Sequence, residues 1–164
     1  NYLAEKSGQA YDKGGEMART GKVLPEIFSD LENLEYYKKT GARSLGREWF
    51  EREVKPLFEN GNTKDLLATA TEHVAARIAA DLNTQQVKNV LITGGGAFNT
   101  FLLERIKTKT SCELILPSAE IINFKEALIF ALLGHLRLND QNNALASVTG
   151  ASADSCGGAV YRGS

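Results

Sequence analysis

Three consecutive glycines, Gly94, Gly95 and Gly96, stand where an apolar run ends and a helix-like stretch begins, within "VLITGGGAFNTFLLERI". Ordering glycine costs conformational entropy, so a run of three needs a compensating reason. Bare backbone at the carboxyl end of a strand can approach a phosphate or a purine plane, and a following helix favours an anion. A tight turn with close helix packing is the alternative. The spacing fits neither GxGxxG nor GxxxxGK[ST], so both interpretations stay open.

Two polar residues near predicted helix starts are further candidates. Asn99 follows the last glycine by three residues. It could cap the next helix or bind a ligand, and on its own capping is the better interpretation. Glu126 follows Asn123 by three residues, which is the spacing of a capping pair. Glu126 could instead bond substrate hydroxyls from the mouth of a buried helix, although position alone favours the cap.

A basic loop precedes the aromatic pair Trp49-Phe50. Arg43 and Arg47 in this loop could reach a phosphate, because guanidinium groups bind phosphate oxygens in two-pronged fashion. A structural ion pair with Glu48 is an equally good interpretation. The segment "KKTGARSLGREWF" is predicted to be a loop up to its aromatic end.

The histidines and cysteines do not form a recognisable site. His73 is predicted on the polar side of an amphipathic helix and His135 near the end of an apolar one, and neither has metal-ligand neighbours at suitable spacing. Cys112 and Cys156 lack a metal-type or disulfide-framework spacing, which indicates a reducing compartment, although a disulfide between them stays open. We therefore assign no metal ligand and no catalytic histidine.

The first half of the chain is predicted to be mainly helical. One helix should end at Gly8, "YDKGG" (11–15) should be a turn, and another helix should begin at Pro25. The longest amphipathic helix begins after Asn62, a suitable cap. Its expected apolar stripe, with Leu66 and Ala75 flanking it, is Leu67, Ala70, Val74, Ile78 and Leu82.

The second half alternates strand, helix, strand and helix. The strands are "VKNVLIT" and "CELILP", and the first is predicted to be buried because its apolar residues do not alternate with polar ones. The last long helix is expected to open at Asn123 and, being apolar nearly all round, to be buried on more than one side. The order predicts an α/β chain, helix-rich with a short parallel sheet. Two strands are too few for a doubly wound sheet, so we expect a fragment of a larger α/β protein.

The composition is that of an ordinary globular chain of 164 residues, 43% hydrophobic and 24% charged. Lysine plus arginine total 19 and aspartate plus glutamate 20, a formal net charge of −1. This balance argues against electrostatic binding to nucleic acid or an anionic membrane. No apolar run approaches the roughly 20 residues that span a bilayer, and no signal peptide is recognisable. We expect a cytoplasmic location.

Several stretches, in order, resemble the C-terminal half of anhydro-N-acetylmuramic acid kinases. They are "YDKGG", "ARTGKV", "RSLGREWF", "VLITGGGAFNTFLLERI", "INFKEALIFALLGHL" and "SVTGASADSCGGAVY". The resemblance covers nearly the whole chain. It implies that residues 1–164 are a partial C-terminal domain of a two-domain sugar kinase with the actin-like ATPase (ribonuclease H-like) fold of the actin, hexokinase and Hsp70 superfamily.

The resemblance also implies an activity and its ligands. The family opens the 1,6-anhydro ring of anhydro-N-acetylmuramic acid with water and transfers the γ-phosphate of ATP to the 6-oxygen, in murein recycling; Mg²⁺ is expected with ATP. It implies that Gly94, Gly95 and Gly96 lie on the adenosine side of the nucleotide with Asn99 close by. Glu126 would contact the sugar.

One departure from the family's pattern bears on activity. The family's aspartate that activates water lies in a "D-x-G-x-x-N" stretch upstream of where this chain begins, and no residue here matches it. We therefore expect the 164-residue piece to be inactive alone. An exposed sheet edge would invite self-association, with a homodimer as one outcome. The alternatives are a non-catalytic nucleotide-binding or interaction module and another sugar kinase of the superfamily.

Overall fold

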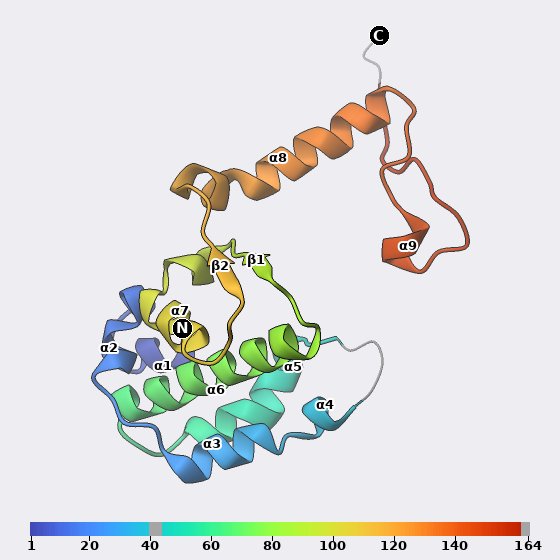
Figure 1. Ribbon diagram of the computed structural model, residues 1–164. Coiled ribbons are helices and arrows are strands. Elements are labelled where there is room, and N and C mark those ends of the chain that lie inside the picture. The colour runs from blue at the N-terminus through green and yellow to red at the C-terminus, as the bar shows by residue number, and fades with distance from the viewer. Residues whose placement is uncertain (40–43, 162–164) are drawn as a thin grey trace. The chain divides into compact units, whose positions relative to one another are not determined.

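The computed structural model describes residues 1–39 and 44–161. The chain divides into two compact units, Asn1–Leu116 and Pro117–Ser164, which we call the larger unit and the C-terminal unit. Figure 1 shows helices and two short strands in the first and helices alone in the second. None of the helices among the described residues is both long enough and apolar enough to cross a membrane.

The larger unit is built mostly from short helical segments around one long helix. In chain order its elements are α1 (Tyr2–Glu5), η1 (Lys13–Gly15), α2 (Glu16–Arg19), α3 (Pro25–Glu32), α4 (Glu35–Lys38), α5 (Arg47–Trp49), η2 (Phe50–Val54), η3 (Lys55–Phe58), α6 (Thr63–Thr84), β1 (Asn89–Leu91), η4 (Gly95–Phe98), α7 (Thr100–Lys107) and β2 (Glu113–Ile115). The predicted helix at Pro25 and the two predicted strands are confirmed. The C-terminal unit contains α8 (Ala119–Leu138) and α9 (Ala146–Thr149).

The long helix α6 is the centre of the larger unit and contacts α1, α2, α3 and α7. As predicted, Asn62 caps it, with its side-chain oxygen accepting from the Lys64 backbone N–H at 2.9 Å. The predicted stripe is wrong in part, because Val74 and Ile78 are 42% and 38% exposed. Helices pack on α6 from several directions, so burial follows contact rather than a single face. The residues of α6 that are buried are Leu66, Ala68, Thr69, His73, Ala75 and Ala79.

The aromatic segment after the undescribed residues is helical from Arg47 onward, so the predicted loop is wrong there. Trp49 and Phe50 turn toward the hydrophobic core, where they pack against its buried members. Those members are Leu3, Leu31, Val54, Phe58 and Leu66. Aromatic burial rather than helix propensity explains this conformation, since each large ring removes much apolar surface from water.

The two strands form a parallel pair, with Val90 opposite Leu114 in the register. Both strands alternate exposed, half-buried, exposed, and Leu91 is 58% exposed, so the predicted burial of the first strand is wrong. The half-buried Val90 and Leu114 face a small apolar cavity that residues of α6 and α7 also line. The described residues of this unit thus cover one face of the sheet and leave the other face open. A sheet covered on one face has strands whose residues alternate between buried and exposed.

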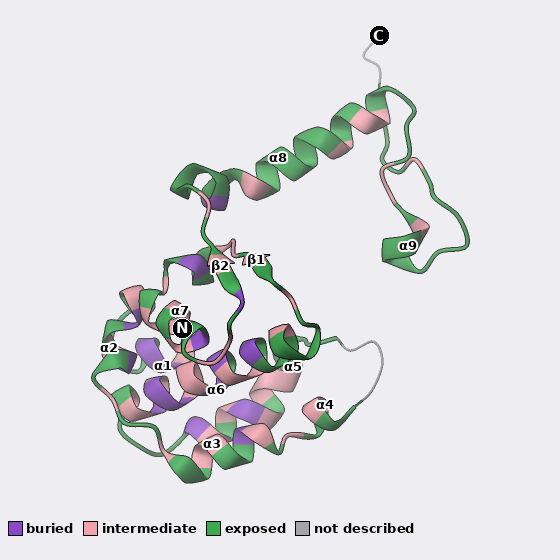
Figure 2. Cartoon of the chain, in the orientation of Figure 1, coloured by how far each residue is buried: buried purple, intermediate pink, exposed green. Residues whose placement is uncertain are grey.

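The C-terminal unit begins with α8, whose cap is Ser118. The predicted start at Asn123 is wrong by one helical turn, and Asn123 lies inside the helix. The predicted burial is also wrong: Phe124 and Phe130 are 66% and 71% exposed, and only Ile122 of this helix is buried. Figure 2 shows the helix coloured almost entirely as exposed. Helix α8 therefore has many more apolar residues than the described residues of this chain bury.

Candidate functional site

The glycine turn, which we define as Gly94, Gly95 and Gly96, follows directly after the parallel strands. The Ile92 N–H donates to the Ile115 carbonyl at 2.9 Å, so strand-like pairing continues to within two residues of the turn. Gly94 has φ +80°, a backbone conformation that residues with a Cβ rarely adopt. This requirement explains the first glycine without any ligand.

Backbone conformation does not explain Gly95 and Gly96. Neither has a positive φ, and a Cβ built on either would meet no described atom within 4 Å beyond its chain neighbours and the backbone of its own helical turn. Close packing of the helix on the strand therefore gives no reason for their lack of a side chain. Their N–H groups lie in the first turn of η4, where helical geometry supplies no acceptor. The turn thus presents bare backbone to open space, which is the arrangement a flat or anionic ligand requires.

Asn99 is the cap of the next helix, as the spacing predicted. Its side-chain oxygen accepts from the Leu102 N–H at 3.0 Å, and its own backbone N–H donates to the Gly96 carbonyl at 3.0 Å. The residue therefore joins the last glycine to the first turn of α7. The cap uses the side-chain oxygen, so the amide nitrogen and the second lone pair of the oxygen are left for a ligand.

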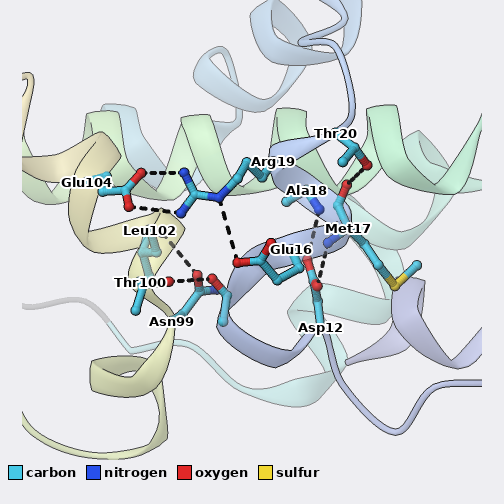
Figure 3. A network of polar contacts seen from close by, with 11 residues as sticks. Asp12, Glu16, Met17, Ala18, Arg19, Thr20, Asn99, Thr100, Leu102 and Glu104 are labelled. Atoms are coloured by element: carbon cyan, nitrogen blue, oxygen red, sulfur yellow. Dashed lines mark hydrogen bonds and ion pairs between the residues drawn. The ribbon is translucent and has the colours of Figure 1, made fainter.

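The segment "YDKGG" lies against this cap, which sequence reasoning missed. The Thr100 hydroxyl donates to the Gly14 carbonyl at 3.0 Å, and a Cβ on Gly15 would lie 2.4 Å from the Asn99 side-chain oxygen. Asp12 holds the segment in shape, because its carboxylate accepts from two backbone N–H groups of α2. Figure 3 shows Asn99 and Thr100 beside this segment and Asp12 bonded to Met17 and Ala18. In the sequence, the adjacent Gly14 and Gly15 were the only sign that another part of the backbone comes close to this segment.

An ion pair completes this contact between α2 and α7. Both terminal nitrogens of Arg19 donate to the Glu104 carboxylate, at 2.6 and 2.8 Å, and the guanidinium lies over the Phe101 ring at 4.9 Å. The hydrogen bonds from Arg19 lower the pKa of Glu104 below its ordinary value. Both partners are exposed, so we expect the pair to orient the two helices more than to stabilise the fold.

Two hollows lie near these elements. An open depression of about 440 Å³ lies over the "YDKGG" segment; its lining residues are Gln9, Tyr11, Asp12, Lys13, Gly14, Glu16 and Met17. An apolar cavity of about 220 Å³ lies beneath the sheet and reaches Gly96 of the glycine turn and the adjacent Ala97. Its apolar lining comes from α6, α7 and both strands, so part of it is imperfect packing between the sheet and its helices.

Glu126 lies in the C-terminal unit, inside α8. It is exposed, and because the helix starts at Ala119 it is not a first-turn partner of Asn123. The capping interpretation is therefore wrong. Glu126 is therefore an exposed carboxylate that takes no part in the cap of α8. Its contact with a sugar stays a prediction.

The remaining candidates have local roles. Arg47 pairs with Glu51 at 3.5 Å on the next turn, rather than with Glu48, and Glu51 also accepts from Lys55. Arg43 lies outside the described residues. Cys112 and Cys156 are both free, with Cys112 buried. Within the described ranges no three His, Cys, Asp or Glu side chains are grouped so as to hold a metal ion.

A glycine turn at the carboxyl end of parallel strands, with a capped helix after it, is characteristic of α/β proteins that bind ligands beyond their strand ends. A family model described as anhydro-N-acetylmuramic acid kinase matches residues 1–163. The chain belongs to this family.

Individual relatives carry the same description. An anhydro-N-acetylmuramic acid kinase of Hydrogenovibrio crunogenus is 34% identical over 164 residues, covering 93% of this chain and 44% of the relative. That of Aliivibrio fischeri is 31% identical over 178 residues, covering 98% of this chain and 46% of the relative. The chain therefore spans a little under half the length of these relatives.

Proposed function

We propose that this chain is the C-terminal part of an ATP-dependent sugar kinase. The full protein would hydrolyse the 1,6-anhydro ring of anhydro-N-acetylmuramic acid and phosphorylate its 6-oxygen, in murein recycling in the cytoplasm. Family membership over residues 1–163 supports this proposal. Residues 1–164 would be part of the C-terminal domain of a two-domain, actin-like ATPase fold, whose further strands would cover the open face of the sheet.

In this proposal the glycine turn contacts the adenosine side of ATP. The observation that carries it is the open space at Gly95 and Gly96, where an added Cβ would meet no described atom within 4 Å beyond its chain neighbours and the backbone of its own helical turn. A purine plane can stack against a peptide only where no side chain stands in the way. Gly94 supplies the sharp exit from the strand, and Asn99 orients the helix behind the turn.

Glu126 is the proposed sugar contact. Its carboxylate is exposed and can accept hydrogen bonds from hydroxyl groups. No residue of this chain is assigned as the base that activates water, so the chain alone should not turn over. Mg²⁺ accompanies ATP in most phosphoryl transfers. The described residues include no acidic cluster that fits the ion, and we assign it no ligand here.

The first test is titration of ATP into the full-length gene product by calorimetry, with Gly95→Val beside the wild type. The valine side chain would fill the space that the purine needs, so we expect the variant to lose at least about tenfold in affinity. The control is Ala80→Val, which places the same valine side chain at an exposed position of α6 in the same unit. Equal ATP affinity for wild type and Gly95→Val would refute contact at the turn.

The second test addresses the sugar. The full-length protein should transfer phosphate from ATP to anhydro-N-acetylmuramic acid, and Glu126→Gln should raise KM for the sugar while leaving KM for ATP unchanged. Phosphorylation of another sugar but not this one would contradict the substrate assignment. ATP binding without transfer to any sugar would favour a non-catalytic nucleotide-binding module.

A further inference from the structure

The segment from Asp12 to Arg19 is in direct contact with the helix that follows the glycine turn. Three independent interactions join them: the Thr100 hydroxyl to the Gly14 carbonyl, the backbone of Gly15 against the Asn99 side chain, and Arg19 to Glu104. On α7 these contacts involve Asn99, which is the cap, Thr100, which is the first residue, and Glu104, which lies in the middle of the helix. Two of the three contacts therefore lie at the end of α7 that follows the turn.

Gly15 permits the closest of these approaches. Its φ is +77°, and an added Cβ would lie 2.4 Å from the Asn99 oxygen and 2.6 Å from the Phe101 Cβ. A side chain here would have to displace Asn99. Because Asn99 also donates its backbone N–H to the Gly96 carbonyl, that displacement would reach the last glycine of the turn directly.

Arg19 and Glu104 join α2 to α7. The two hydrogen bonds define the orientation of both side chains, and the Arg19 Cζ lies 4.9 Å from the centre of the Phe101 ring. Glu16 adds a weaker attraction, 3.7 Å from the Arg19 Nε. Within the segment the Asp12 carboxylate accepts hydrogen bonds from the backbone N–H groups of Met17 and Ala18, at 2.8 and 2.9 Å. Figure 3 shows these bonds and the Arg19–Glu104 pair.

We propose that Gly15 and the Arg19–Glu104 pair are positioning residues for the nucleotide: they hold Asn99 and the start of α7 so that the glycine turn keeps the geometry that ATP contacts. The inference rests on the proposed ATP contact at the turn and adds residues that lie outside it. Misplacing a binding turn by a fraction of an ångström weakens a ligand whose fit depends on close approach. Loss of positioning should therefore act on ATP and not on the sugar.

The test uses steady-state kinetics of the full-length gene product at varied ATP and varied sugar. Gly15→Ala should raise KM for ATP on the order of tenfold, with KM for the sugar and kcat at saturating ATP within about twofold of wild type. Arg19→Glu and Glu104→Arg should each raise KM for ATP, and the double variant, which re-forms the pair in reverse, should restore it. The charge reversals keep the proposal testable if Gly15→Ala fails to fold.

The matched control is Arg105→Ala, which breaks a different ion pair of α7, that with Glu72 of α6 at 2.7 Å. It should lower the melting temperature without raising KM for ATP. An equal rise in KM for ATP in this control, or no rescue in the double reversal, would overturn the positioning role. Direct titration of ATP into the same variants separates the two proposals, because a wild-type protein that binds no ATP refutes the proposed function itself.

Discussion

Glycines in this chain serve different physical purposes at different positions. At Gly94 the backbone needs a positive φ. At Gly21 the reason is close approach, since an added Cβ would lie 2.0 Å from the Lys64 carbonyl oxygen and 2.8 Å from the Asp65 N–H nitrogen. At Gly95 and Gly96 neither reason applies. The same is true of Gly134 inside α8, so it is the place of Gly95 and Gly96 just beyond the strand ends that points to a ligand.

Gly21→Ala should therefore destabilise the protein without any direct effect on ligands. The clash is with the backbone at the start of α6, which cannot rotate away as a side chain can, so we expect a loss of about 1–3 kcal/mol in the free energy of unfolding. Urea unfolding measures it. Gly46→Ala is the control, because there the nearest atom is a mobile Glu48 carboxylate oxygen. Equal stability of the two variants would contradict the argument.

At the scale of elements, α3, α4 and α6 meet at a polar cluster that the pattern of α6 did not predict. His73, expected on the polar side, is 5% exposed. Its Nδ1 lies 2.8 Å from a Glu32 carboxylate oxygen and its Nε2 lies 3.0 Å from the Tyr37 hydroxyl. Burial lowers the pKa of His73 below its ordinary value of 6.5, with Glu32 opposing the shift and Arg77 adding to it. The imidazole is therefore neutral in the folded protein near pH 7.

This cluster should make the stability of the larger unit depend on pH. Below pH 6.5 the unfolded chain binds a proton at His73 that the folded chain resists, so stability falls as pH falls from 6.5 toward the lower folded pKa. Thermal midpoints at about pH 7.5 and about pH 5.5 should differ more for the wild type than for His73→Gln. The control is His135→Gln, an exposed histidine of α8, which should leave the wild-type difference intact. A larger difference in His73→Gln would reverse the assigned direction.

At the scale of the whole molecule, the chain exposes more apolar surface than a stable monomer usually does. Phe124, Leu128 and Phe130 are 66%, 68% and 71% exposed on α8, and both strands expose alternate residues. Exposed apolar side chains of this kind favour association.

The 164-residue chain should therefore self-associate in solution as its concentration rises. Sedimentation velocity should show species larger than the monomer, and Phe124→Ser together with Phe130→Ser should shift the distribution back toward it. Glu120→Ser, a polar exchange on the same helix, is the control and should leave the distribution unchanged. A wild-type chain that stays monomeric at high concentration would contradict this expectation.

Local signals were sufficient for several features of this protein. The caps at Asn62 and Asn99 and the helix start at Pro25 depend on interactions within a few residues, and each is confirmed. The two strands are also confirmed, although they pair with each other across 24 residues of the chain, as in Val90 with Leu114. The ordered motifs were likewise enough to indicate the family. The start of α8 was the exception, because Ser118 and Asn123 are both acceptable caps and the sequence pattern favoured the wrong one.

Burial and neighbourhood depended instead on contacts between distant parts of the chain. Periodicity shows that α6 has an apolar face but not that helices would pack on it from several sides and enclose His73. Nor does it show that Gly15 would lie against Asn99, more than eighty residues away, because that contact exists only once α2 and α7 have packed. A short-range pattern specifies conformation, whereas the environment of each side chain follows from which surfaces meet.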